Sequence, residues 1–129
     1  MSDAKPSATL LRQRIRNRLF EVMRAAATFE GVASVGAFET INGWDDFSQP
    51  ERFYQPPVFS PDECLAIEAF GRALDHASDA TETDVCSAAA LSARPEWRDV
   101  VEAAMTGIEI FDRRGSFSDI EAIDANPTD

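Results

Sequence analysis

The chain contains one histidine, His76, in a setting that could support proton transfer or weak cation binding. His76 directly follows Asp75 and precedes Asp79 by three residues, so a carboxylate could orient its imidazole as a general base. A histidine near the C-terminal end of a helix is more often solvent-exposed, where its protonated form suits the helix dipole. A single histidine excludes two-histidine metal sites and the paired Glu-x-x-His motifs of di-iron bundles. We predict neither a metal nor a cofactor.

A second group of candidate residues lies around Trp44. Asp45 and Asp46 directly follow this tryptophan, and Tyr54 lies in the same aromatic stretch. Adjacent carboxylates could hold a hard cation or the hydroxyls of a sugar, although such pairs more often form a solvated turn. The candidate ligand-binding residues are the aromatic and acidic side chains of this stretch together with the histidine: Trp44, Asp45, Asp46, Tyr54 and His76.

No residue pattern indicates a catalytic nucleophile. Cys64 follows a predicted helix start, where the helix dipole could lower the pKa of a thiol, but its place on the apolar face favours packing. The Gly-Ser-Phe-Ser stretch at 115–118 lacks the second glycine of a nucleophile elbow. Neither a phosphate-binding loop nor a dinucleotide-binding fingerprint is present. The sequence therefore assigns no catalytic residue and favours a non-enzymatic protein over an enzyme.

Charge is divided along the chain. Residues 1–24 carry six basic and two acidic side chains, a balance of +4, whereas residues 25–129 carry six basic and 21 acidic side chains, a balance of −15. The basic segment is also an amphipathic helix whose apolar stripe is flanked by arginines. It could dock on the acidic body, which we favour, or bind RNA or an anionic membrane, or form a dimer seam. The candidate partner-binding residues are its arginines: Arg12, Arg14, Arg16 and Arg18.

Composition limits the class of protein. The net charge of −11 argues against a nucleic-acid-binding body, because an acidic surface repels phosphate. The start of the chain lacks the apolar region of a signal peptide, and no apolar run is long enough to span a membrane. We expect a cytoplasmic protein that binds neither nucleic acid nor membrane. Eleven arginines to one lysine indicate a GC-rich, bacterial genome.

The pattern of apolar residues predicts an all-α fold. We expect one domain over residues 1–129, with loose tails at 1–7 and 124–129, Ser7 or Thr9 as the first N-cap and Gly31 ending the first helix. The fold would be an irregular helical bundle of three long and two or three short helices. A long aromatic and proline-rich loop at 44–60 would cross it, and residues 32–43 remain open between a short helix and an irregular connection. The predicted helices are 8–29, 61–77, a short one capped by Thr83 and ending at Ala93, and 95–113, with a terminal turn at Ser118.

Two local signals support these boundaries. Ser60-Pro61-Asp62-Glu63 has the pattern of a capping box, with proline at the first helical position. The helix at 95–113 places its apolar residues on one face. We predict a core in which the apolar face of this helix packs on the helices at 8–29 and 61–77. Its residues are Trp97, Val101, Ile108 and Phe111, packed against Leu11, Ile15, Leu19 and Phe70.

Two functional hypotheses remain open. The first is a non-enzymatic protein-interaction or regulatory module, whose acidic body would suit a basic protein partner and which could form a homodimer. The second is a small-molecule-binding or enzymatic helical bundle with a pocket between residues 44–60 and 95–113. A pocket with polar groups around Trp44, Tyr54 or His76 would favour the second, and a closed core with a flat acidic face would favour the first.

Overall fold

The computed structural model describes residues 7–123, of which about 71% are helical, and shows no β-strand among them. This confirms the predicted all-α class. The predicted tails fall almost wholly outside the described residues, except that Ser7 caps the first helix by accepting a hydrogen bond from the Leu10 amide at 3.1 Å. The elements are α1 (Ala8–Ala26), α2 (Phe29–Val35), α3 (Ala37–Phe47), the 3-10 helix η1 (Glu51–Phe53), α4 (Pro61–Ala80), α5 (Ala88–Ser92) and α6 (Pro95–Asp112).

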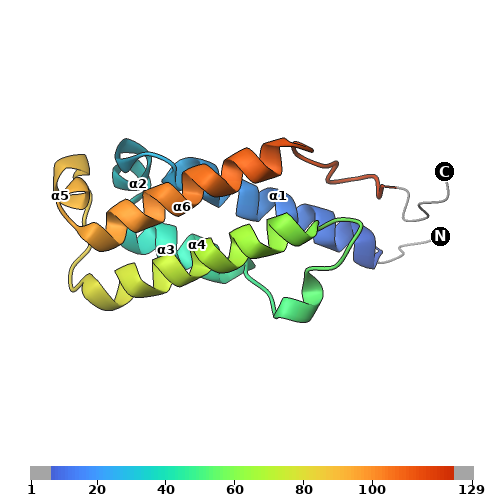
Figure 1. The fold of residues 1–129 in the computed structure, drawn as a ribbon, viewed down its shortest axis with the longest axis horizontal. Helices are drawn as coiled ribbons and strands as arrows, with labels where there is room; N and C mark the ends of the chain where they lie inside the picture. The colour runs from blue at the N-terminus through green and yellow to red at the C-terminus, as the bar shows by residue number, and fades with distance from the viewer. Residues whose placement is uncertain (1–6, 124–129) are drawn as a thin grey trace.

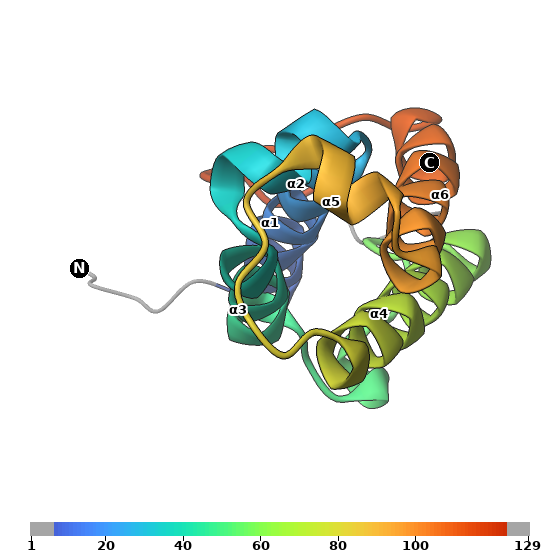
Figure 2. The ribbon, with the colours of Figure 1, turned by 90° about the vertical axis from the view of Figure 1, so that its left-hand side faces the viewer.

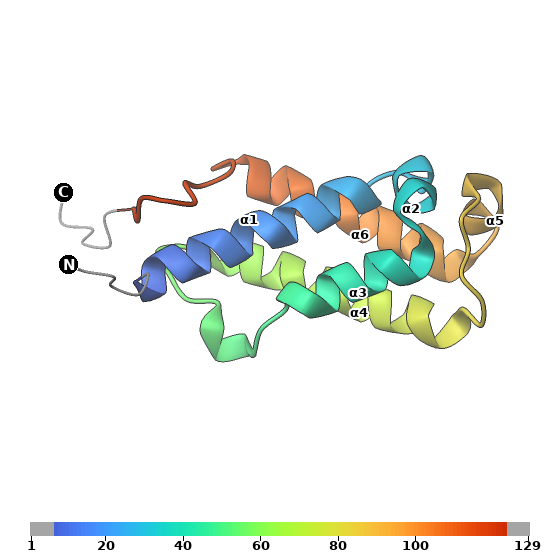
Figure 3. The same ribbon diagram turned by 180° about the vertical axis from the view of Figure 1, so that it is seen from behind.

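Four helices form the body of the bundle (Figures 1 and 2). Going around it, α1 packs beside α3, α3 beside α4, α4 beside α6, and α6 beside α1. The short helices α2 and α5 pack on each other at one end. In the view from behind, α1 and α4 run in one direction while α3 and α6 run in the other (Figure 3). The two long helices α1 and α4 are therefore parallel, an arrangement that their sequences left open.

The first predicted helix is divided in two. It ends at Ala26, and Thr28 starts α2 by accepting a hydrogen bond from the Gly31 amide at 2.9 Å. Gly31, predicted to end the helix, lies inside α2 instead. A Cβ atom at this position would lie 2.0 Å from the carbonyl oxygen of Ala25, so the corner between the helices requires glycine.

The ambiguous stretch at 32–43 and the start of the predicted loop are helical and belong to α2 and α3. Gly36, at φ +103°, separates α2 from α3, and α3 continues to Phe47. The N-terminus of α3 is capped from a distant segment, because the Asp84 carboxylate accepts a hydrogen bond from the Phe38 amide at 3.0 Å. The prediction of an extended loop was therefore wrong for residues 44–47, and the connection runs over 48–60 with η1 inside it.

Two predicted helix ends also need correction, whereas the turn predicted at Ser118 is present. Ser87, not Thr83, caps the short helix α5, while α4 continues beyond Ala77 to Ala80. No helix follows Ser118 within the described residues. Its hydroxyl accepts hydrogen bonds from the amides of Ile120 and Glu121, which makes a local turn. The side chains of Ser87 and Ser118 thus both accept hydrogen bonds from following amides, but only that of Ser87 begins a helix.

The core differs from its prediction at two residues, one on α6 and one on α1. Trp97, Val101 and Phe111 are buried as predicted. Ile108 is only half-buried, and Leu11 is 44% exposed. The inward face of α1 begins instead with polar side chains and becomes apolar only in its second half; its buried residues are Gln13, Arg16, Asn17, Leu19, Phe20, Met23 and Ala26.

The capping box at the start of α4 is present as predicted. Ser60 accepts a hydrogen bond from the Glu63 amide at 3.2 Å, and the Glu63 carboxylate accepts one from the Ser60 amide at 3.0 Å. We expect Ser60→Ala to lower the free energy of unfolding by about 1 kcal/mol, because alanine leaves the Glu63 amide without its acceptor. Urea denaturation measures this change. Ser87→Ala, at the cap of α5, gives a matched comparison, and an unchanged midpoint in Ser60→Ala would contradict the capping role.

Candidate functional site

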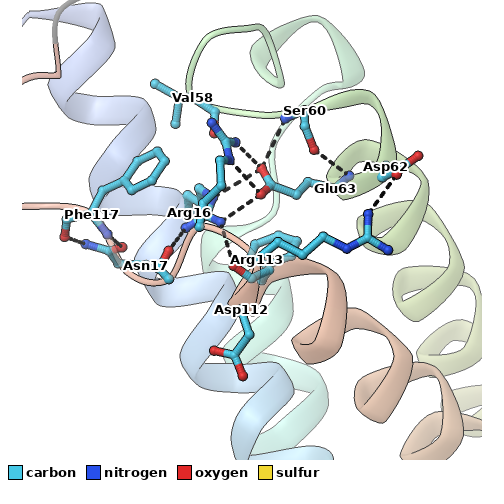
Figure 4. Close-up of polar contacts among 12 residues, drawn as sticks. Arg16, Asn17, Val58, Ser60, Asp62, Glu63, Asp112, Arg113 and Phe117 are labelled. Atoms are coloured by element: carbon cyan, nitrogen blue, oxygen red, sulfur yellow. Dashed lines mark hydrogen bonds and ion pairs between the residues drawn. The ribbon is translucent and has the colours of Figure 1, made fainter.

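The most concentrated group of charges surrounds Glu63 (Figure 4). Arg16 of α1 donates two hydrogen bonds to this carboxylate, at 3.2 Å from Nε and 2.8 Å from Nη2. Arg114, which follows α6, donates two more through Nε and Nη2. The side chains of Arg16 and Glu63 are 0% and 1% exposed. One acidic side chain therefore joins α1, α4 and the end of α6.

This network has a structural role rather than a catalytic one. Burial raises the pKa of Glu63, but the hydrogen bonds from Arg16, Arg114 and the Ser60 amide outweigh it, so the pKa lies below its ordinary value. The carboxylate accepts five hydrogen bonds, which leaves it no free direction from which to take a substrate proton. Two arginines face one carboxylate, and both also donate hydrogen bonds to backbone carbonyls. Arg16 donates to those of Gly115 and Phe111, and Arg114 donates to those of Pro57 and Val58.

The four predicted partner-binding arginines lie in different environments. Arg16 is fully buried, which its place beside the apolar stripe did not indicate. Arg12 donates to the Phe53 carbonyl at 2.8 Å, and its guanidinium lies 5.5 Å from the Phe53 ring centroid. Arg14 donates to the backbone carbonyl of Asp119, and Arg18 pairs with the carboxylate of the same residue at 3.1 Å. All four contact other parts of the chain.

An open groove of about 830 Å³ lies between the end of α3, the 48–60 connection and α4, and we call it the Trp44 groove. It contains two of the five predicted ligand-binding residues, Trp44 and Tyr54. No residue of α6 lines it, so this groove is not the pocket predicted between residues 44–60 and 95–113. The lining residues are Trp44, Ser48, Gln49, Glu51, Arg52, Tyr54, Gln55, Cys64, Leu65, Ile67, Glu68, Gly71, Arg72 and Asp75.

Packing fixes the two aromatic residues of this groove. Trp44 is 4% exposed and meets Phe70 edge to face, with ring centroids 4.7 Å apart. The Tyr54 hydroxyl accepts a hydrogen bond from the Gln49 amide at 2.7 Å, and burial raises the pKa of this phenol. Burial, together with the charge of nearby Glu63, also raises the pKa of the Cys64 thiol. This thiol is not activated as a nucleophile.

The other three predicted ligand-binding residues lie outside the Trp44 groove. Asp45 and Asp46 are exposed on α3, because residues one and two positions after Trp44 point to other sides of the helix. His76 is exposed on α4, in a shallow hollow that also contains Asp79 and Glu96. The structure therefore brings only Trp44 and Tyr54 of the five candidate residues together in this groove.

A second surface combines exposed apolar and acidic residues, and sequence analysis missed it. Met105 is 55% exposed on α6, where it lies beside half-buried Ile108 and Phe29 at the start of α2. These side chains border a hollow of about 680 Å³. We call it the α2–α6 face; its residues are Phe29, Arg98, Val101, Glu102, Met105, Thr106, Ile108, Glu109 and Asp112. The apolar stripe of this helix assigned Ile108 to the core, where it is only half-buried.

Residues 7–123 were also compared with the requirements of a membrane span and of a metal site. None of their helices has both the length and the hydropathy that a bilayer span requires. Within the same residues, no three His, Cys, Asp or Glu side chains are grouped so that they could bind a metal ion. Comparisons with protein-family models, curated proteins and solved structures found no match for this chain.

Proposed function

We propose that this protein is a non-enzymatic protein-interaction module that binds a basic amphipathic segment of a partner on the α2–α6 face. The observation that carries the proposal is the combination of exposed apolar side chains with acidic neighbours on one helix. Large apolar side chains gathered at the surface and bordered by polar residues are typical of interaction sites. Met105 and Ile108 would supply the apolar contact, with Phe29 beside them.

Charge indicates the chemistry of the partner. Glu102, Glu109 and Asp112 border the apolar residues, against Arg98 on the same face and Arg24, which pairs with Asp112 at 3.8 Å. Residues 25–129 as a whole carry a balance of −15, so the long-range field also favours a cationic partner. Complementary charge raises the association rate and selects the partner, while the apolar centre supplies most of the affinity. A helix with apolar residues on one face and lysines or arginines beside them fits both requirements.

A designed peptide tests this proposal. The probe is an 18-residue amphipathic helix with leucines on one face and lysines on the other, and its twin carries glutamates in place of the lysines. We expect the basic peptide to shift the amide resonances of Glu102, Met105 and Ile108 in NMR titrations, and the affinity to fall as salt screens the charges. The acidic twin should not bind.

Two variants locate the contact. Met105→Glu should weaken binding of the basic peptide at least tenfold, because it places a charge in the apolar centre. Leu65→Glu makes the same change at a side chain that is 64% exposed on α4, and it should leave the affinity unchanged. Equal losses in both variants, or shifts confined to the Trp44 groove, would contradict the proposed site.

A second candidate function is the binding of a small planar molecule in the Trp44 groove. The indole Nε1 of Trp44 makes no hydrogen bond to the described residues, although the tryptophan lines the groove. It could donate to a ligand carbonyl while Tyr54 and Leu65 contact the ring. Benzamide is a suitable probe. It should shift the indole resonance of Trp44 and leave that of Trp97 unchanged, whereas equal shifts of both resonances would contradict a specific site.

A further inference from the structure

The inward face of α1 binds the main chain of a distant segment. Gln13, Arg16 and Asn17 are buried on this face, where an amphipathic helix ordinarily places apolar residues. The hydrogen-bond partners of Gln13 and Asn17 lie beyond α6, in residues 116–123, which we call the strap; Arg16 contacts this segment only through the Phe117 ring. The strap leaves the end of α6 and runs past the first half of α1 without forming a helix (Figure 3).

Two side-chain amides hold the strap. Asn17 binds the backbone of Phe117 on both sides, donating to its carbonyl at 2.7 Å and accepting from its amide at 2.9 Å (Figure 4). Gln13 donates to the carbonyls of Ser118 and Glu121, at 3.0 and 2.9 Å, and accepts from the amide of Ile123 at 2.6 Å. This is recognition of an extended peptide through its backbone.

The side chains of the strap add two specific contacts. The Phe117 ring centroid lies 4.3 Å from the guanidinium of buried Arg16, a favourable cation–π arrangement. The Asp119 carboxylate accepts hydrogen bonds from Asn17 at 2.9 Å and from Arg18 at 3.1 Å. Most other strap side chains are exposed, and Ile120 is 80% exposed. Release of the strap would uncover the partly buried Phe117 and Ile123 and no larger part of the core, so its local opening should cost less than global unfolding.

The junction with α6 is suited to a change of direction. Gly115 adopts φ +72°, a conformation that favours glycine, and a Cβ at this position would meet nothing within 4 Å. The strap therefore begins at a glycine with open space beside its Cα atom, although rotation would break the hydrogen bond from Arg16 to the Gly115 carbonyl at 2.6 Å. Rotation there would direct the strap away from its own α1.

We propose that the polar face of α1 is a docking site for an extended acidic peptide, and that it accepts the strap of a second copy of this chain. In such a dimer the strap would make in trans the hydrogen bonds that it makes in cis. Exchange of identical segments is a low-cost route to a dimer, because no new complementary surface is needed. This contact differs from a dimer seam along the apolar stripe of α1.

The short connection between α6 and the strap determines whether the strap binds its own α1 or that of a second copy. A short connection gives the strap a local concentration on the order of millimolar at its own α1, so dilute wild-type protein should be monomeric. Exchange becomes observable when the cis contact is removed. Two full-length variants achieve this from opposite sides of the contact.

The experiment mixes a receptor-defective chain with a strap-defective chain. Gln13→Ala/Asn17→Ala removes the amides but keeps the strap intact, whereas Phe117→Ala/Asp119→Lys damages the strap but keeps α1 intact. Analytical ultracentrifugation at tens of micromolar should show a 1:1 complex in the mixture and monomers in each variant alone. Wild type mixed with the receptor-defective chain should remain monomeric, because its own strap occupies its α1.

A second measurement tests the docking site even if the receptor-defective variant fails to fold. A labelled peptide of residues 115–123 is titrated into the strap-defective chain, and we expect binding at least tenfold tighter than to wild type. The same peptide with lysine at the Asp119 position should bind at least tenfold more weakly. If the strap-defective chain retains its helical circular dichroism but binds neither the peptide nor the partner variant, the docking site is disproved.

Discussion

Replacing Glu63 with glutamine will lower the free energy of unfolding by about 3–5 kcal/mol, since removal of one member of a buried ion pair leaves the other charge uncompensated. Arg16 is fully buried and would lose its anionic partner, and Arg16 and Arg114 would each keep only one of the two oxygen atoms to which they donate. Glutamine keeps nearly the same shape, so the effect reports charge rather than a cavity. Urea denaturation monitored by circular dichroism measures it.

An exposed ion pair provides the matched control. Glu68 pairs with Arg72 on α4 at 3.0 Å, with both side chains more than half exposed. We expect Glu68→Gln to cost less than about 1 kcal/mol, because water and salt screen such a pair. Similar losses in Glu63→Gln and Glu68→Gln would show that the buried network does not hold the three helices together.

The same carboxylate predicts a dependence on pH. The folded-state pKa of Glu63 lies below its ordinary value of 4.5, so its stabilisation is complete above that pH and is lost as pH falls through the folded-state pKa. The difference in unfolding free energy between wild type and Glu63→Gln should therefore be constant near neutrality and shrink below about pH 4.5. A difference that grows as pH falls would contradict the assigned direction.

Replacing Trp97 with alanine will cost about 3–5 kcal/mol, the range for removal of a large aromatic side chain from a packed core. Trp97 is completely buried at the start of α6. Its indole also donates a hydrogen bond at 2.9 Å to the Thr81 hydroxyl, which in turn donates to the Ala77 carbonyl at 2.6 Å. The substitution therefore removes apolar packing and the contact that fixes the end of α4.

Two further substitutions separate these contributions. Trp97→Phe keeps an aromatic ring but loses the donor to Thr81, and it should cost about 1–2 kcal/mol. Met105→Ala, on the exposed side of the same helix, should change stability by less than about 0.5 kcal/mol. Urea denaturation of all three variants provides the measurement. A loss below 1.5 kcal/mol in Trp97→Ala would mean that this end of the bundle is loosely packed.

The sequence by itself determined the helices whose signals are local. The start of α4 was predicted from four consecutive residues, because a capping box is completed within one turn. The start of α6 followed from Pro95 and a regular apolar pattern. The all-α class rests on the same short-range information, since helical hydrogen bonds join residues four apart.

Tertiary structure decided the features whose partners lie far away in the chain. Asp84 caps α3 from 46 residues away, and Asn17 meets Phe117 across 100 residues, so neither contact leaves a periodic pattern. The position of Arg16 beside an apolar stripe indicated a solvent-facing flank, and only the buried Glu63 carboxylate makes its burial favourable. Conversely, Met105 belongs to an apolar stripe but stays exposed, because no helix among residues 7–123 covers its side chain. A stripe shows which residues share a face, but the neighbouring elements decide which face is covered.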